Sequence, residues 1–206
     1  MAEHEPPLAA TEPLDGLERR IGAVTLSAIE GRALVCMAFP AARRDTVSAR
    51  VSDRLGIALP DISRCTGDAM RLIGLQRDQV WCTFASAGAS AADDMLAERL
   101  GEDHGVRLTD QSGGWAQLRI DGADAVAVLE RLCPLDLHER ALPVDGCART
   151  AMEHLGVIIV RTAPDSFELL TARSSAHSFV HALETAAGHV AAERTLTGSG
   201  PVPTAH

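Results

Sequence analysis

Two histidines four residues apart, His177 and His181, are the residues whose types and spacing most suggest a metal site. On a helix this spacing places both side chains on one face, where two imidazoles can bind one ion. The intervening Ser-Phe-Val lacks the glutamate that a His-Glu-x-x-His zinc protease uses as its base, and no third ligand is indicated. We therefore interpret the pair as part of a solvated helix face or a subunit contact.

The segment Cys-Pro-Leu-Asp-Leu-His, from Cys133 to His138, brings a thiol, a carboxylate and an imidazole close together in the sequence. Nucleophilic catalysis requires the nucleophile and its base to lie within hydrogen-bonding distance in space. The proline and the alternating leucines predict a bent, extended segment in which the three groups need not converge. We interpret this segment as the exit from a helix.

No familiar nucleotide-binding or hydrolase motif occurs. All 19 basic residues are arginine, and lysine, tyrosine and asparagine are absent. The absence of lysine excludes lysine Schiff bases and the Gly-x-x-x-x-Gly-Lys phosphate loop. Gly-x-Ser-x-Gly and Gly-x-Gly-x-x-Gly are also missing, and the acidic pairs at 93–94 and 102–103 are typical of helix ends. We predict that this chain alone has no catalytic, cofactor-binding or metal-binding residues.

The composition is that of a globular protein with its own core. The chain has 206 residues, of which 46% are apolar, and a formal net charge of −9. That charge repels a phosphate backbone, which argues against nucleic-acid binding. The apolar runs are much shorter than the ~20 residues of a membrane span, and the N-terminus lacks the basic start and apolar core of a secretory signal. We therefore expect a cytoplasmic protein with no membrane contact.

The cysteines form no recognisable framework. They are odd in number, widely spaced and without a Cys-x-x-Cys pair. They are Cys36, Cys65, Cys82, Cys133 and Cys147. This pattern predicts reduced thiols that pack as small hydrophobic side chains.

The apolar pattern before residue 102 predicts a strand, a helix, a hairpin and a second helix. The strand is the continuous apolar run at 32–39, and the first helix ends at Gly56. The apolar stripe of this helix consists of Val47, Val51 and Leu55. The hairpin covers 70–84, and Ser90 is expected to begin the second helix. The stripe of the second helix is Met95, Leu96 and Leu100.

A second set of elements follows residue 102. A half-buried strand is expected at 115–120, and a short helix follows the turn at Gly122. In that strand Trp115, Leu118 and Ile120 are expected to point inward, and Gln117 and Arg119 outward. The helix buries Ala125, Val128, Leu129 and Leu132. Strands at 156–161 and 166–171 form a hairpin, and a last helix from Ser174 or Ser175 buries Ala176, Phe179, Val180 and Leu183.

Hairpins with helices between them, without strict strand-helix alternation, predict an α+β fold with antiparallel sheets. We expect two small subdomains, at 18–102 and 103–195. Residues 1–17 and 196–206 are rich in proline, glycine and acidic or small polar residues, and we expect them to form a flexible arm and a flexible tail.

The later segments resemble the gamma subunit of heterotetrameric sarcosine oxidase. The resemblance rests on the order and spacing of four stretches and covers roughly residues 105–190. They are Leu-Thr-Asp-Gln-Ser-Gly-Gly-Trp from Leu108, Gly-Ala-Asp-Ala-Val-Ala-Val-Leu from Gly122, Leu-Cys-Pro-Leu-Asp-Leu-His from Leu132, and Ala-Arg-Thr from Ala148. The same region is more distantly similar to the glycine-cleavage T-protein, which implies a T-protein-like fold.

This resemblance implies an assembly. In that family a large alpha subunit is associated with NAD and tetrahydrofolate, a medium beta subunit with FAD and FMN, and a small delta subunit with zinc. The gamma chain holds none of these cofactors, and the complex oxidatively demethylates sarcosine or a related N-methyl amino acid. The resemblance thus implies a scaffold for partners that bind flavin and folate.

One departure from the T-protein pattern concerns chemistry. T-proteins place an acidic pair after the glycine-rich turn for one-carbon transfer to folate, whereas this chain has Gly-Val-Ile-Ile-Val at 156–160. Apolar side chains cannot act as a general base. The resemblance therefore implies a fold that has lost the folate chemistry.

Two other functions remain open from the sequence. One is a free-standing T-protein-like folate-binding protein, and the other is an unrelated binding module for a small molecule. Large apolar side chains that could anchor a partner are Trp81, Trp115, Leu135 and Leu137, and each is equally compatible with the core.

Overall fold

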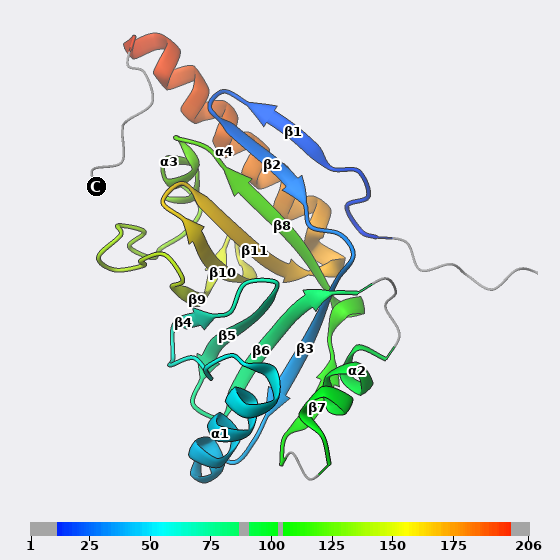
Figure 1. The fold of residues 1–206 in the computed structure, drawn as a ribbon. Coiled ribbons are helices and arrows are strands. Elements are labelled where there is room, and N and C mark those ends of the chain that lie inside the picture. The colour runs from blue at the N-terminus through cyan, green and yellow to red at the C-terminus, as the bar shows by residue number, and fades with distance from the viewer. Residues whose placement is uncertain (1–11, 87–90, 103–104, 199–206) are drawn as a thin grey trace, which may run out of the picture.

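In a computed structural model, residues 12–86, 91–102 and 105–198 are described, and they form two antiparallel β-sheets with helices on their outer faces (Figure 1). The α+β class expected from the sequence is confirmed. Within the described ranges no helix is both long enough and apolar enough to cross a membrane.

The larger sheet has six strands. In spatial order they are β1 (Glu18–Ile21), β2 (Val24–Ala28), β8 (Trp115–Asp121), β11 (Ser166–Ala172), β10 (Leu155–Ala163) and β9 (Cys147–Met152). The smaller sheet has five strands. They are β4 (Arg64–Thr66), β5 (Met70–Gln76), β6 (Gln79–Ala85), β3 (Arg32–Ala38) and β7 (Arg107–Asp110).

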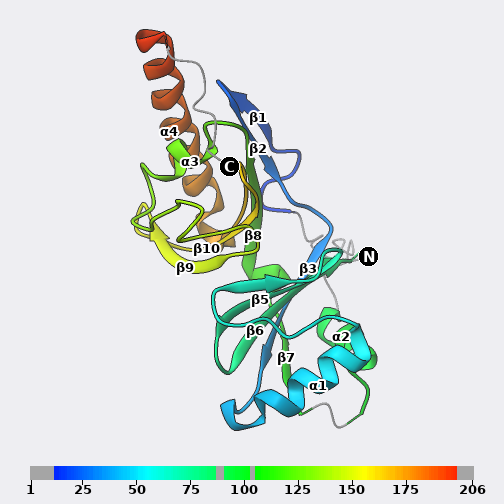
Figure 2. The same cartoon turned by 60° about the vertical axis from the view of Figure 1, so that its left-hand side comes forward.

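Two helices pack on each sheet. Helices α1 (Arg44–Leu55) and α2 (Ala92–Leu100) lie on the smaller sheet, and α3 (Ala125–Leu129) and α4 (Ala176–Thr197) on the larger one (Figures 1 and 2). Short 3-10 turns precede α1, β8 and α4, at Ala41–Arg43, Ser112–Gly114 and Arg173–Ser175. Helix α1 ends at Gly56, whose left-handed conformation (φ 68°) suits a residue without a Cβ.

The core has three parts because alternate residues of each strand point to opposite faces of a sheet. The outer face of the larger sheet packs against α3 and α4 through residues such as Leu118, Phe167 and Phe179. The outer face of the smaller sheet packs against α1 and α2 through residues such as Val35, Val51 and Leu96. The inner faces share a third cluster, which we call the inter-sheet core. It consists of Leu34, Cys36, Cys65, Ile73, Trp81, Cys147, Ile158, Val160 and Leu170, with Leu75 and Trp115 packed against it.

The two sheets are also joined at their edges. Arg64 on β4 and Gly146, just before β9, form an isolated antiparallel bridge. Backbone hydrogen bonds flank it on both sides, from Cys65 N to Asp145 O (2.7 Å) and from Cys147 N to Ser63 O (3.1 Å). The edge of the smaller sheet is therefore hydrogen-bonded to the chain that enters the edge strand of the larger sheet.

The strands of the two sheets are interleaved along the chain. Strands β1 and β2 come first, yet β2 pairs with β8 in the larger sheet. Strand β7 follows residue 102, yet it pairs with β3 in the smaller sheet. A single cut at residue 102 would separate both segments from their partners, so we propose that any subdomains follow the sheets and not the expected ranges 18–102 and 103–195.

The ordered structure extends beyond both expected ends. Leu14, placed in the flexible arm from the sequence, is 6% exposed and packs in the core of the larger sheet. Helix α4 continues to Thr197, past the expected start of the tail at residue 196. The remainder of both predicted segments, 1–11 and 199–206, lies outside the described residues.

Most elements form where the apolar pattern predicts them. The strand β3, the helix α1, the hairpins β5–β6 and β10–β11 and the helix α4 are confirmed within one or two residues. Ser90 lies outside the described residues, and α2 begins at Ala92.

Two predicted side-chain orientations are wrong. Trp115 shares the inner face of β8 with Gln117, because both are odd-numbered positions, whereas Leu118 and Ile120 point outward to the helices. In α2 the buried stripe runs through Ala92, Leu96 and Leu100 at four-residue steps, and Met95 on its flank is 38% exposed.

Candidate functional site

A charged cluster lies between the two sheets with Glu168 on β11 at its centre. The carboxylate accepts hydrogen bonds from Arg32 on β3 (2.6 Å) and from Arg119 on β8 (2.9 Å). Arg119 faces Glu168 within the larger sheet, whereas Arg32 belongs to the smaller sheet. The ion pair between Arg32 and Glu168 therefore links the two sheets.

The environment of Glu168 decides its protonation state. Burial of this side chain, which is 5% exposed, would by itself raise its pKa. The hydrogen bond and charge of Arg32, the hydrogen bond of Arg119 and the charge of Arg71 together outweigh burial and hold the pKa of Glu168 below its usual value. The carboxylate is thus ionised at neutral pH, and both of its oxygens are engaged, which leaves it poorly suited to act as a base.

The cluster holds more guanidinium than carboxylate groups. Arg71 also lies 3.9 Å from the more exposed Asp145, beyond hydrogen-bonding distance. In the described part of the chain no acceptor reaches Nη1 of Arg71 or Nε of Arg119, although both atoms are buried. Gln117 donates to the carbonyl of Arg32 (3.2 Å). These contacts position the two sheets, and they offer no nucleophile.

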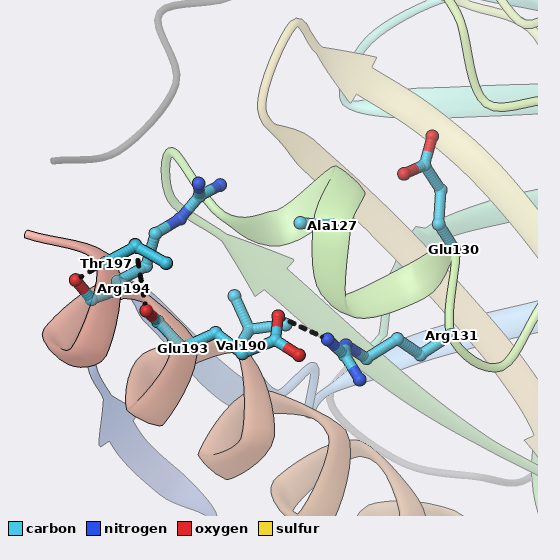
Figure 3. A pocket seen from close by; sticks show the side chains of 7 residues that line it. All are labelled: Ala127, Glu130, Arg131, Val190, Glu193, Arg194 and Thr197. Atoms are coloured by element: carbon cyan, nitrogen blue, oxygen red, sulfur yellow. Dashed lines mark hydrogen bonds and ion pairs between the residues drawn. The ribbon is translucent and has the colours of Figure 1, made fainter. Parts of the chain in front are cut away.

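A pocket of about 420 Å³ lies between α3 and the C-terminal half of α4 (Figure 3). Its lining residues are Ala127, Glu130, Arg131, Val190, Glu193, Arg194 and Thr197. Arg131 reaches across to Glu193 (2.5 Å), and Arg194 pairs with Asp124 (2.9 Å). The hydrogen bond from Arg131 holds the pKa of Glu193 below its usual value. The charges of this pocket thus neutralise one another and connect the two helices.

A groove of about 590 Å³ runs along the exposed side of α4. Its residues are Arg131, Leu132, Glu153, Leu155, Ser178, His181, Ala182, Thr185, Ala186 and His189. Both histidines are exposed, as is His177 one turn earlier. Across the described ranges no group of three or more potential ligands is placed to hold a metal ion. The exposure of His177 and His181 is compatible with both a solvated helix face and a subunit contact.

The segment from Cys133 to His138 folds as a helix exit, and its three polar groups do not converge. The carboxylate of Asp136 accepts a hydrogen bond from the backbone of His138 (2.9 Å), and the imidazole of His138 accepts one from the backbone of Arg140 (3.2 Å). Cys133 is buried in the core. These turn-forming contacts occupy the groups that catalysis would need.

A buried arginine that the sequence analysis missed organises this segment. Arg161 on β10 is 2% exposed and donates hydrogen bonds to the carbonyls of Leu137 (3.1 Å) and Leu142 (2.9 Å). Its guanidinium lies 5.2 Å from the ring centre of Phe167. Arg161 directly follows the apolar run of β10, and a charged residue at this place in the sequence could have indicated a buried, hydrogen-bonded arginine.

The four candidate interface anchors separate into two classes. Trp81 and Leu137 are buried in the core, which is one of the two alternatives that the sequence left open for them. Trp115 is half-buried and meets Trp81 edge to face, with ring centres 5.0 Å apart. Leu135 is half-buried and packs against the core of the larger sheet. Among the described residues, the large apolar side chains that are well exposed are Ile62, Met95, Val144 and Leu196.

All five cysteines are free and buried, as expected for small packing residues. Cys65 and Cys147 come together at the edge bridge, which their sequence positions do not reveal. Likewise, no local pattern connects Arg32 with Glu168, because they are 136 residues apart. Both contacts depend on how the two sheets are brought together.

Strand β10 is apolar in its central part. Val157, Ile158, Ile159 and Val160 are fully buried, alternately in the outer and the inter-sheet core. These are the positions at which the sequence analysis noted a departure from the T-protein pattern. Packing, rather than proton transfer, accounts for the residues found there.

Comparison with known proteins gives a consistent assignment. The family model described as GCVT N-terminal domain matches residues 62–195. The chain is 33% identical over 110 residues to the sarcosine oxidase subunit gamma of Corynebacterium sp. (strain P-1), which covers 53% of each protein. It is 28% identical over 137 residues to the subunit gamma of Corynebacterium sp. (strain U-96), which covers 66% of each. The aligned regions thus span between half and two thirds of these relatives.

Solved structures agree on the fold. One chain of the heterotetrameric sarcosine oxidase from Corynebacterium sp. U-96, in complex with pyrrole 2-carboxylate, superimposes with a TM-score of 0.74 at 24% identity. That match covers 88% of this chain and 96% of the other. The glycine cleavage system aminomethyltransferase T from Bartonella henselae matches with a TM-score of 0.57 at 20% identity, over 79% of this chain and 46% of that protein. The T-protein-like fold expected from the sequence is confirmed, and the chain belongs to the GCVT N-terminal domain family.

Proposed function

We propose that this chain is the gamma subunit of a heterotetrameric sarcosine oxidase-type complex, which oxidatively demethylates sarcosine or a related N-methyl amino acid. In this complex the chain has no active site of its own and positions the subunits that bind flavin and folate. The observation that carries the proposal is the correspondence with nearly the whole of one chain of such an oxidase. The relatives named subunit gamma support the same assignment.

The proposed partners are a large alpha, a medium beta and a small delta subunit. FAD, FMN, NAD, tetrahydrofolate and zinc belong to those subunits in this proposal, and none to this chain alone. The buried, free cysteines favour a reducing compartment, and we propose the cytoplasm.

Two features of the chain favour a scaffold over a folate enzyme. The central residues of β10 are apolar and buried, so they supply no general base. The buried carboxylate of Glu168 is held by two arginines that come from both sheets. Both arrangements contribute to the packing of the two sheets.

The proposal is tested by purifying the tagged full-length chain from its native cells. The visible absorption spectrum and the mass of every co-purifying chain are then measured. We expect a yellow complex that contains three further chains, one much larger and one much smaller than this one, and that consumes oxygen when sarcosine or a related N-methyl amino acid is added. The matched control is the Leu137→Asp variant, which disrupts the core and should recover no partners.

A colourless chain recovered alone would contradict the proposal. Tight folate binding by that isolated chain would then support a free-standing T-protein-like protein. A stable monomer that binds another small molecule would support a separate binding module.

A further inference from the structure

Cys65 and Cys147 meet where the edges of the two sheets are joined. They flank the bridge between Arg64 and Gly146, and hydrogen bonds from the backbone N–H of each cysteine hold the two segments together. In an antiparallel pair, residues on either side of such a bridge project to the same face. Both side chains accordingly belong to the inter-sheet core, where Cys65 is 6% and Cys147 0% exposed.

The thiol of Cys147 lies against the peptide group that precedes Cys65. Its sulfur is 3.5 Å from the carbonyl oxygen of Arg64, whose carbon is bonded to the nitrogen of Cys65. It is also 3.6 Å from the carbonyl oxygen of Gly74 on the neighbouring strand β5. Cys82 and Cys133 are buried in the two outer cores instead, so neither shares this position.

The two thiols influence each other's ionisation. A hydrogen bond from the Cys65 thiol lowers the pKa of Cys147, against the effect of burial and with help from Gly74 and the charge of Arg64. The same contact raises the pKa of Cys65, and burial raises it further. One proton is thus lost first and the other retained, and the thiolate is the reactive form of cysteine.

We propose that Cys65 and Cys147 form a modification site at which hydrogen peroxide converts the two thiols into a disulfide between the sheets. The thiolate of Cys147 attacks one peroxide oxygen, so that an S–O bond forms, the O–O bond breaks and the departing hydroxide takes up a proton as water. The sulfur of Cys65 then attacks the sulfenic acid, so that the S–S bond forms, the S–O bond breaks and a second water leaves. Two thiols are oxidised and one peroxide is reduced.

A disulfide between Cys65 and Cys147 requires only a small movement of the two backbone segments. Diagonal neighbours across an antiparallel pair lie about 7 to 8 Å apart, and the Cα atoms of a disulfide lie up to about 6.8 Å apart, so the two segments must approach by about 1 Å. Strand β4 has three residues and lies at a sheet edge, so it can open locally to admit peroxide and shift to form the bond. This inference goes beyond the proposed function and does not depend on it.

The test treats the purified full-length chain with hydrogen peroxide, alkylates the remaining thiols after denaturation, and maps the digested peptides by mass spectrometry. We expect a peptide that links Cys65 to Cys147, an intact mass lower by two hydrogen atoms, and a higher melting temperature than that of the reduced chain. The Cys82→Ser variant is the matched control and should form the link. The Cys65→Ser and Cys147→Ser variants should not.

The wild-type peptide map decides the question even if a serine variant does not fold. Full alkylation of both Cys65 and Cys147 after peroxide treatment would overturn the proposal. So would a disulfide that joins either of them to Cys36, or oxidation spread equally over all five cysteines.

Discussion

Glu168 is the residue that joins the charges of the two sheets. Its carboxylate is buried, and arginines from both sheets compensate its charge. A buried pair of this kind contributes little compared with an apolar replacement, but the loss of one partner leaves an uncompensated charge behind. The consequence is that Glu168 should tolerate substitution poorly for structural reasons alone.

Replacement of Glu168 by glutamine keeps the size of the side chain and removes its charge. We expect the free energy of unfolding at neutral pH to fall by about 3 kcal/mol, because Arg32 and Arg119 lose their counter-charge. The value lies at the lower end of the range for buried pairs because Arg119 is only partly buried. Urea denaturation of both proteins measures this difference. The Glu193→Gln variant is the control, because its ion pair is exposed to solvent and its loss should change the stability little.

The same residue predicts how stability depends on pH. The pKa of Glu168 is lower in the folded chain than in the unfolded chain, where it is about 4.3. Its stabilising contribution is therefore complete above that value and is lost as the pH falls through the folded pKa. The difference in melting temperature between wild type and Glu168→Gln should shrink below about pH 4. A difference that stays constant down to low pH would show that the charge is not the cause.

At the scale of elements, hydrophobic periodicity is a strong guide in this sequence. The apolar run of β3 and the four-residue steps of α4 correspond to buried positions, because period two and period 3.6 follow from backbone geometry alone. Periodicity fails at β8, where both faces are covered. Trp115 is apolar yet lies on the opposite face from Leu118, and polarity alone could not distinguish the two faces.

Helix α4 contains a glycine, which has a low helix propensity. Gly188 is exposed in the helix, and a Cβ added there would meet nothing within 4 Å. We expect Gly188→Ala to raise the free energy of unfolding by about 1 kcal/mol through helix propensity, as measured by thermal or chemical denaturation.

The matched control is the same change at Gly122, after β8. There φ is 127° and a Cβ would lie 2.0 Å from the carbonyl oxygen of Ala23, so Gly122→Ala should destabilise the fold by about 2 kcal/mol or more. Equal effects of the two substitutions would contradict this account.

At the scale of the whole molecule, the arrangement of the strands was beyond reach of the sequence pattern. Local apolar periods predict that a strand forms, but not which strand it pairs with. The hairpins β5–β6 and β10–β11 follow from short turns. In contrast, β2 pairs with β8 and β3 pairs with β7 although these strands lie far apart in the sequence. The inter-sheet contacts of Glu168 and Cys147 depend on that arrangement and were missed with it.

The interleaved strands predict the behaviour of fragments. A fragment of residues 18–102 contains β1 and β2 without β8, and one of residues 103–195 contains β7 without β3. We expect neither fragment to unfold cooperatively on heating when followed by circular dichroism, because each exposes unpaired strands and a half-covered core. An equimolar mixture should recover a cooperative transition. A sharp transition in either fragment alone would identify it as an independent domain.

The position of β8 also bears on how the chain folds as it is made. The β1–β2 hairpin leaves the ribosome early, but its neighbour β8 follows only after the strands of the smaller sheet have been synthesised. The outer core of the larger sheet is covered by α4, which follows all the described strands in the sequence. The nascent chain therefore exposes the apolar side chains of Val24 and Leu26 on β2 until α4 has been made, and it is a natural client for chaperones that shield such surfaces.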